Sequence, residues 1–259
     1  MERSIFRTVL CYSVLQLLFI TLFGPMQSIS TKSIAIYGSA SVILQILLFA
    51  FLMYFKTDFF NQSTGMPLSK INMANRITLL RISSLPTIAF LLHHNDINQI
   101  RYILPFLLIL VFLTDSFDGQ IARRRKQITR MGSMLDSISD YALLFVISIV
   151  YFRNEIVPHW FFFLIFFRLF LQAMGMLVFI LLRKPIEAKS TWGGKITIAT
   201  TMTLYVIELV RLFLPQEYGY IFRIIEYISG VIILFFCFEK ARIFFHQGKE
   251  VKRERKEPN

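Results

Sequence analysis

The sequence has few of the residues that form disulfide frameworks and soft-metal sites. Its two cysteines, Cys11 and Cys237, lie in separate apolar segments and lack the spacing of a metal or redox motif. We interpret both as packing residues. Four histidines are scattered near the ends of apolar segments: His93, His94, His159 and His246. We therefore expect no metal site built on cysteine or histidine.

Acidic residues are also few, with 16 Asp and Glu against 28 Lys and Arg, for a formal net charge of +12. A basic balance of this size can indicate nucleic-acid binding. Here the basic residues cluster between apolar runs, as the positive-inside rule describes for membrane proteins. We therefore expect a lipid bilayer as the partner and no nucleic acid.

Long apolar runs dominate the chain, which is 55% hydrophobic and contains 28 Phe. Several runs approach or exceed the ~20 residues that span a bilayer. We predict an all-α polytopic membrane protein, a six-helix core preceded by two transmembrane helices. The eight spans are expected near residues 8–23, 34–55, 75–92, 103–122, 133–151, 160–182, 194–214 and 220–238. A signal peptide is the alternative for the first run, but Ser28-Ile-Ser30 is a poor cleavage site, so we favour a retained helix.

The distribution of charge predicts the organisation of the chain. Most Lys and Arg lie at the termini and in connectors 56–76, 123–131 and 183–195, which we therefore place on the cytoplasmic side. We predict an accessory transmembrane hairpin, a connector, a catalytic membrane domain and a basic cytoplasmic tail: residues 1–56, 57–74, 75–240 and 241–259. The connector is expected to hold a short amphipathic helix on the membrane surface over residues 67–75.

Two local features are predicted inside the helices. Pro86 should kink the helix over residues 75–92, because proline lacks a backbone N–H. Glu208 and Arg211 stand three residues apart and should form an ion pair on one helix face.

Four carboxylates inside or beside apolar sequence are the strongest functional signal, because such groups are costly there. Asp115 and Asp118 share a helix face with Gly119 and Ala122, at i, i+3, i+4 and i+7. Gly132, Asp136 and Asp140, at intervals of four residues, form a second stripe. A basic loop separates the two segments, so their helices can run antiparallel with the four carboxylates facing one cavity.

Four such carboxylates would repel one another unless cations neutralised them. Oxygen ligands favour hard cations such as Mg²⁺, Mn²⁺ or Ca²⁺, and Mg²⁺ is commonly shared between carboxylates and substrate phosphates. Small residues on the same face leave room for a bulky ligand, and Arg123 suits a phosphate group. Together these features suggest a nucleotide diphosphate substrate.

The stretch from Asp115 to Asp140 resembles the signature of the CDP-alcohol phosphatidyltransferase family, Asp-x-x-Asp-Gly-x-x-Ala-Arg-x₈-Gly-x-x-x-Asp-x-x-x-Asp, at every fixed position. Asn75-Arg-Ile-Thr78-Leu-Leu-Arg81 resembles a second family pattern, in which the Asn and Thr line the cytidine pocket. The resemblance begins near Asn75 and reaches the last helix. It implies that CDP-lipid is bound by residues from three segments: Asn75, Thr78, Gly119, Ala122, Arg123, Thr129 and Gly132.

The resemblance also implies a role for each carboxylate toward two divalent cations, Mg²⁺ or Mn²⁺. Asp115 would bridge both cations, Asp118 would bind the first, and Asp136 would bind both. Asp140 would contact the second cation and act as the catalytic general base. The implied reaction moves a phosphatidyl group from CDP-diacylglycerol to the hydroxyl of a small alcohol and releases CMP.

The acceptor alcohol is suggested by a shorter resemblance. Trp192-Gly193-Gly194-Lys195-Ile196-Thr197-Ile198 is similar to a Gly-Lys-x-Lys-Thr element of members that use phosphorylated acceptors. Lys195 and Arg168 would bind the acceptor phosphate, which favours glycerol 3-phosphate as acceptor and phosphatidylglycerophosphate as product. The second Lys and the Thr of that element fall on Thr197 and Ile198, so serine, inositol phosphate and choline stay open as alternatives.

Two other functions compete with this one. A CDP-linked amino alcohol could be the donor and diacylglycerol the acceptor, with the same metal motif. A cation-binding transporter would use the carboxylates as an ion site, but they lie near one membrane face and no inverted repeat is visible. We predict an integral protein of a bacterial cytoplasmic membrane with its active site facing the cytoplasm, and the resemblance makes a homodimer possible.

Overall fold

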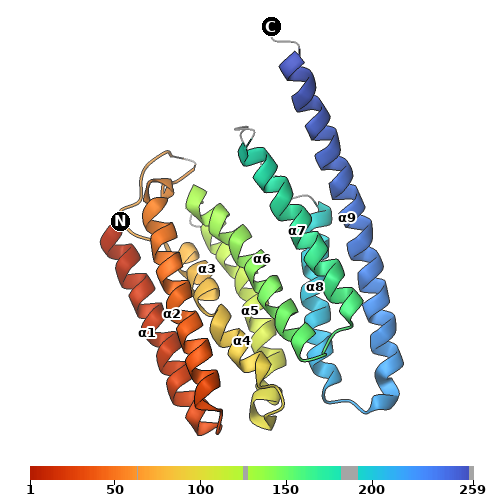
Figure 1. Ribbon diagram of the computed structural model, residues 1–259. Helices are drawn as coiled ribbons and strands as arrows, with labels where there is room; N and C mark the ends of the chain where they lie inside the picture. Colours follow the sequence, from red (N-terminus) through yellow and green to blue (C-terminus); the bar gives the residue numbers. More distant parts are fainter. Residues whose placement is uncertain (63, 125–127, 182–191, 257–259) are drawn as a thin grey trace. The chain divides into compact units, whose positions relative to one another are not determined.

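The structure, a computed structural model, describes residues 1–62, 64–124, 128–181 and 192–256. Side chains at 115–119, 121–124, 173, 175–181, 216, 241 and 243–256 are not described. The elements are α1 (Glu2–Met26), α2 (Thr31–Tyr54), η1 (Lys56–Asp58), α3 (Met73–Ser83), α4 (Leu85–His93), α5 (Asn98–Arg124), α6 (Arg130–Arg153), α7 (His159–Leu181), α8 (Trp192–Arg211), η2 (Gln216–Tyr218) and α9 (Gly219–Lys256). They form two compact units, Met1–Val150 and Tyr151–Asn259 (Figure 1).

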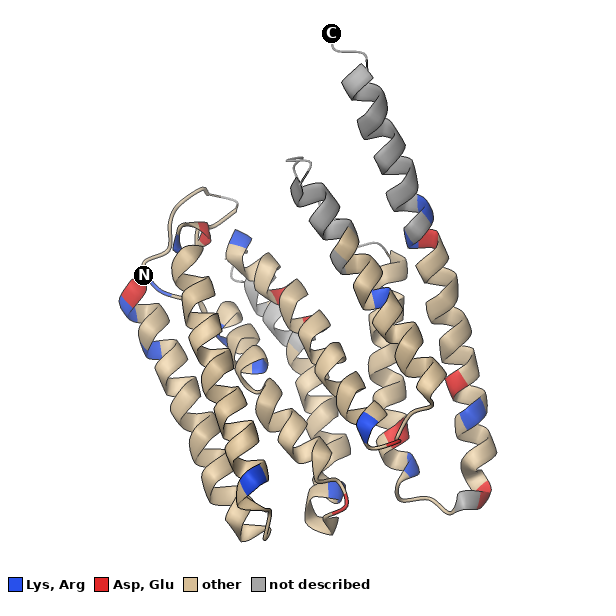
Figure 2. Cartoon of the chain, viewed as in Figure 1, with Lys and Arg blue, Asp and Glu red and all other residues tan. Residues whose placement is uncertain are grey.

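The described helices have the length and composition of membrane spans. Four are long and apolar enough to cross a bilayer: α1, α2, α6 and the Gly219–Lys240 part of α9. Shorter apolar stretches cover Asn98–Thr114 and His159–Gln172. In α1 and α2 the charged residues lie near the helix starts and the remaining turns carry none (Figure 2). The prediction of an all-α polytopic membrane protein is therefore confirmed, whereas the count of eight spans stays a prediction.

In the first unit, α1 and α2 pack against each other as a hairpin and both contact α3 and α4 (Figure 1). Polar side chains inside the bundle join the hairpin to these helices. Thr87 of α4 donates a hydrogen bond to Gln16 of α1, and Ser83 of α3 donates to Gln45 of α2 over 3.4 Å. Such bonds inside an apolar bundle favour one arrangement of the helices, because the alternative is an unsatisfied polar group.

The predicted helix over residues 75–92 is broken into α3 and α4 at Ser84. Pro86 lies in the first turn of α4, where its missing N–H has no helical partner to lose. The Ser84 hydroxyl donates to the carbonyl of Arg81 over 2.8 Å and satisfies one free acceptor at the end of α3. The predicted kink near the proline is confirmed, and it interrupts the helix at Ser84.

The predicted amphipathic helix over residues 67–75 is wrong. Pro67 pairs with Phe60 in an isolated β-bridge, and residues 67–72 are not helical, so the next helix, α3, begins only at Met73. The side chain of Asn72 accepts a hydrogen bond from the Asn75 N–H over 2.9 Å and caps α3 at that point. Proline supplies no donor, and the asparagine cap starts the helix later than the apolar pattern suggested.

In the second unit, α9 packs against α7 and α8. The Tyr151 hydroxyl donates to the carbonyl of Tyr205 over 2.7 Å. Arg211 donates to Glu208 over 3.2 Å, which confirms the predicted ion pair, and also to Glu226 of α9 over 3.0 Å. Cys237 is buried as expected, but Cys11 is exposed, so the interpretation of Cys11 as a packing residue is wrong.

Candidate active site

The predicted lipid-binding residues Asn75 and Thr129 meet where α3 and α6 begin. The Asn75 amide donates to the Thr129 hydroxyl over 3.0 Å, and both side chains are buried. The same hydroxyl accepts a hydrogen bond from the Gly132 N–H over 2.9 Å, so Thr129 is the N-cap of α6. One buried polar cluster thus fixes the starts of two helices. The two residues that join them, Asn75 and Thr129, are 54 positions apart in sequence.

Gly132 lets these two helices approach each other closely. A Cβ atom at this position would lie 2.6 Å from Asn75 Oδ1 and 2.8 Å from Thr129 Oγ1. Both distances are shorter than any real Cβ contact, and both neighbours are held by hydrogen bonds. The position therefore needs glycine for helix packing, whatever else binds nearby.

Thr78 lies one turn after Asn75 on α3. Its side chain is buried, and its hydroxyl donates to the carbonyl of Ala74 over 3.2 Å. The structure therefore brings Asn75, Thr129 and Gly132 together where α3 and α6 begin, with Thr78 one turn further along α3.

Arg81 lies one turn further along α3 and contacts the two carboxylates of α6. Its side chain is only 1% exposed, and its Nη2 atom lies 3.6 Å from Asp136 Oδ1 and 3.4 Å from Asp140 Oδ1. Its Nε atom donates to the Ser139 hydroxyl over 2.6 Å. A buried guanidinium needs compensating charge, and these carboxylates provide it.

Sequence reasoning missed Arg81 as a site residue. The signal was present, because Asn75, Thr78 and Arg81 recur every three residues and stay near one face of a short helix. A buried Arg at the end of that row needed an acidic partner on a neighbouring helix. Nothing in the pattern, however, indicated which acidic residues would lie opposite.

The other half of the predicted carboxylate cluster lies on α5. The backbone of α5 is one continuous helix through residue 124, so the helical spacing assumed for this motif is present. Five predicted site residues have side chains outside the described part of the chain: Asp115, Asp118, Gly119, Ala122 and Arg123. Their convergence with Asp136 and Asp140 therefore stays a prediction.

The described donors fit hard divalent cations. Asp136 and Asp140 stand one turn apart, and both present Oδ1 to the same guanidinium, so their carboxylates converge. The Asp136 side chain is 51% exposed and accessible to a ligand. No group of three or more potential ligands occurs among the residues whose side chains are described, a set that leaves out Asp115 and Asp118. Oxygen donors of this kind suit Mg²⁺ or Mn²⁺.

The predicted acceptor-phosphate residues lie in the second unit. Arg168 of α7 is buried, and its Nη2 atom donates to the carbonyl of Gly194, the residue before Lys195, over 3.1 Å. Lys195 is exposed, and its Nζ atom lies 5.8 Å from the ring centre of Trp192. The two residues therefore meet the same first turn of α8, but their charged groups are held by different partners.

These features define a helical membrane protein with a buried polar site between α3 and α6, to which α6 contributes two carboxylates. A sequence model described as CDP-alcohol phosphatidyltransferase matches residues 71–236. The chain belongs to the CDP-alcohol phosphatidyltransferase family. The accessory hairpin, α1 and α2, lies outside the matched range.

Three similar proteins carry one name, CDP-diacylglycerol–glycerol-3-phosphate 3-phosphatidyltransferase. The protein from Aquifex aeolicus is 28% identical over 167 residues, which are 63% of this chain and 90% of that protein. The Rickettsia bellii protein is 31% identical over 138 residues, which are 53% of this chain and 75% of that protein. The match to the Rickettsia typhi protein is 34% identical over 84 residues and spans about half of that protein, 47%.

Proposed function

We propose that this chain transfers the phosphatidyl group of CDP-diacylglycerol to the hydroxyl of glycerol 3-phosphate. The hydroxyl oxygen attacks the phosphorus atom that carries diacylglycerol and forms a new P–O bond. The P–O bond of the pyrophosphate breaks, CMP leaves, and the hydroxyl proton passes to a carboxylate. The products are phosphatidylglycerophosphate and CMP, and the protein serves phospholipid synthesis.

The observation that carries this proposal is the contact of Arg81 with Asp136 and Asp140 beside the buried Asn75–Thr129 cluster. Arg81 restrains both carboxylates, and Asp140 is only 15% exposed. A sheltered, oriented carboxylate suits a general base, which typically contributes ~10²–10⁴-fold to a rate. We assign that role to Asp140 and the binding of CDP-lipid to the region around Asn75 and Thr78.

Two divalent cations, Mg²⁺ or Mn²⁺, would be held by Asp115, Asp118, Asp136 and Asp140 and would neutralise the pyrophosphate. Side chains of the protein supply proton transfer, orientation and substrate binding. Asp140 takes the proton, and Arg81 keeps it oriented. Asn75 and Thr78 position the cytidine, and Gly119, Ala122, Gly132, Thr129 and Arg123 complete the CDP-lipid site.

Two cationic residues of the second unit, Arg168 and Lys195, favour a phosphorylated acceptor. Arg168 binds the carbonyl at the start of α8, and Lys195 is exposed there as a cation. A helix N-terminus with a nearby cation attracts a phosphate group. We therefore assign Arg168 and Lys195 to the acceptor phosphate. The positive-inside distribution of Lys and Arg supports placing the reaction at the cytoplasmic face of a bacterial inner membrane.

The test is an assay of the purified full chain with CDP-diacylglycerol, Mg²⁺ or Mn²⁺, and a panel of radiolabelled alcohols. The panel contains glycerol 3-phosphate, serine, inositol phosphate and choline. We expect CMP release and labelled phosphatidylglycerophosphate with glycerol 3-phosphate, and loss of both on chelation. Labelled lipid from another alcohol alone would overturn the acceptor, and CMP release from CDP-choline with diacylglycerol would overturn the donor.

A further inference from the structure

A basic pocket lies between α1, the end of α2 and the connector that leads into α3. Its volume is about 940 Å³. Five basic side chains line it: Arg3, Arg7, Lys56, Lys70 and Arg76. The one acidic residue lining it, Glu2, is already paired with Lys56 over 2.6 Å. The pocket therefore carries an excess of positive charge that these residues leave uncompensated.

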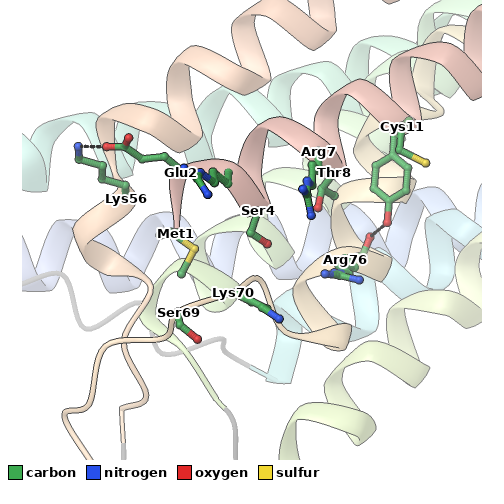
Figure 3. A pocket seen from close by; sticks show the side chains of 12 residues that line it. Met1, Glu2, Ser4, Arg7, Thr8, Cys11, Lys56, Ser69, Lys70 and Arg76 are labelled. Atoms are coloured by element: carbon green, nitrogen blue, oxygen red, sulfur yellow. Dashed lines mark hydrogen bonds and ion pairs between the residues drawn. The ribbon is translucent and has the colours of Figure 1, made fainter.

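Three of the cations come from different segments and surround the same space. Figure 3 shows Arg7 of α1, Lys70 of the connector and Arg76 of α3 around the pocket. None of the three lies within ion-pair distance of a carboxylate among the described residues. The Nε atom of Arg76 is buried and makes no hydrogen bond to the described part of the chain. A buried guanidinium N–H without an acceptor is costly, and an oxygen of a bound phosphate group could satisfy it.

The walls of the pocket are held in place by hydrogen bonds between its segments. The Tyr12 hydroxyl of α1 donates to the Arg76 carbonyl over 3.0 Å. The Ile71 N–H of the connector donates to the Ser4 hydroxyl over 3.1 Å. These contacts tie the accessory helix to the start of α3, so the positions of the cations are largely set before a ligand arrives.

The shape of the pocket favours a lipid over a free anion. Its lining extends along α1 from Met1 to Tyr12, about 16 Å of helix. The charged end of α1 thus gives way within the pocket to the apolar part of a helix long enough to cross a membrane. Beyond Arg7 the lining on α1 carries no charged side chain and consists of Thr8, Cys11 and Tyr12. A phosphate headgroup would meet the cations while acyl chains followed the apolar surface of α1.

We propose that this pocket binds the phosphate group of an anionic phospholipid, at a site separate from the one that contains Asp136 and Asp140. The accessory hairpin thereby gains a role, since it supplies Arg3 and Arg7. The bound lipid would also contact Arg76, the neighbour of Asn75 on α3. This inference does not require the proposed enzymatic reaction, because it concerns binding alone.

The test measures lipid binding to the purified full chain in uncharged detergent by native mass spectrometry. Phosphatidylglycerol and phosphatidylcholine with identical acyl chains are titrated into the parent and into the double variant Arg7→Gln, Lys70→Gln. We expect the parent to prefer phosphatidylglycerol, and the double variant to bind it on the order of tenfold more weakly, as expected when two cations near the headgroup are removed. Phosphatidylcholine binding should not change.

A matched control removes two exposed cations elsewhere, with Lys32→Gln and Arg242→Gln, and should bind phosphatidylglycerol like the parent. A charge-preserving variant, Arg7→Lys with Lys70→Arg, should retain most of the binding. Equal binding by parent and by R7Q/K70Q would overturn the site. An equal loss in the control would show bulk electrostatic attraction instead. Displacement of phosphatidylglycerol by excess inorganic phosphate would overturn the assignment to a lipid.

Discussion

The buried guanidinium group of Arg81, on α3, lies 3.4 Å from Oδ1 of Asp140, on α6. The residues are 59 positions apart in sequence, and both belong to the region that matches the family. Their contact links the helix that carries Asn75 and Thr78 to the helix that carries two of the proposed metal ligands. One contact between helices therefore positions both the proposed cytidine-binding residues and the carboxylates.

Asp140→Asn should abolish most of the transferase activity, because the amide cannot accept the hydroxyl proton. We expect a fall of at least about 10²-fold in CMP release, with the folded protein recovered in normal yield. Asp96→Asn is the control, since Asp96 is exposed in the turn before α5. An Asp140→Asn variant as active as the parent would rule out the assigned base.

Arg81→Lys should reduce activity about 10- to 100-fold, the usual cost of disturbing a partner that orients metal ligands. Lysine keeps the charge but loses the planar fork that reaches Ser139 and both carboxylates at once. The measurement is the rate as a function of Mg²⁺ concentration, and we expect a higher Mg²⁺ requirement. Arg130→Lys is the control, because Arg130 pairs with Asp58 at the protein surface. An unchanged Mg²⁺ requirement would contradict an orienting role for Arg81.

Gly132→Ala should destabilise the protein by about 1–3 kcal/mol, because the new methyl group overlaps Asn75 and Thr129. Gly38→Ala is the matched control: Gly38 lies inside α2, and a Cβ atom there meets nothing within 4 Å. That change should be neutral or stabilising by up to ~1 kcal/mol, since alanine favours helix. Unfolding by denaturing detergent measures both. Equal stability of the two variants would contradict the close approach of α3 and α6.

Lys195→Gln should raise the KM for glycerol 3-phosphate by about tenfold or more, as expected when a hydrogen bond to a charged group is lost. The KM for CDP-diacylglycerol should stay the same and serves as the internal control. An increase in KM without a fall in kcat identifies binding rather than chemistry. If kcat falls and the acceptor KM is unchanged, Lys195 does not bind the acceptor phosphate.

Arg211→Met should destabilise the second unit, because Arg211 joins Glu208 of α8 to Glu226 of α9. Both glutamates are at least 97% buried, and removal of the cation from such a group typically costs about 3–5 kcal/mol. Arg223→Met, an exposed change on α9, should cost less than ~1 kcal/mol. Thermal unfolding in detergent compares the two. A similar midpoint for both variants would show that the cluster contributes little.

The amino-acid sequence by itself determined the fold class, the approximate positions of the long apolar helices and the family. Apolar runs long enough to cross a bilayer must satisfy their backbone groups internally, which makes helices of them. The motif from Asp115 to Asp140 identified the family because its spacing is specific. The break at Ser84 was foreseeable in part, since Pro86 removes a helical donor.

Tertiary structure alone decided which side chains meet. Helical periodicity places Arg81 and Asp140 on faces of their own helices, but it does not say which faces turn toward each other. Thr129 was expected to bind CDP-lipid, and in the structure it caps α6 and accepts a hydrogen bond from Asn75. The pocket lined by Arg7, Lys70 and Arg76 likewise exists only because α1 folds back onto α3, bringing together charges that are far apart in the chain.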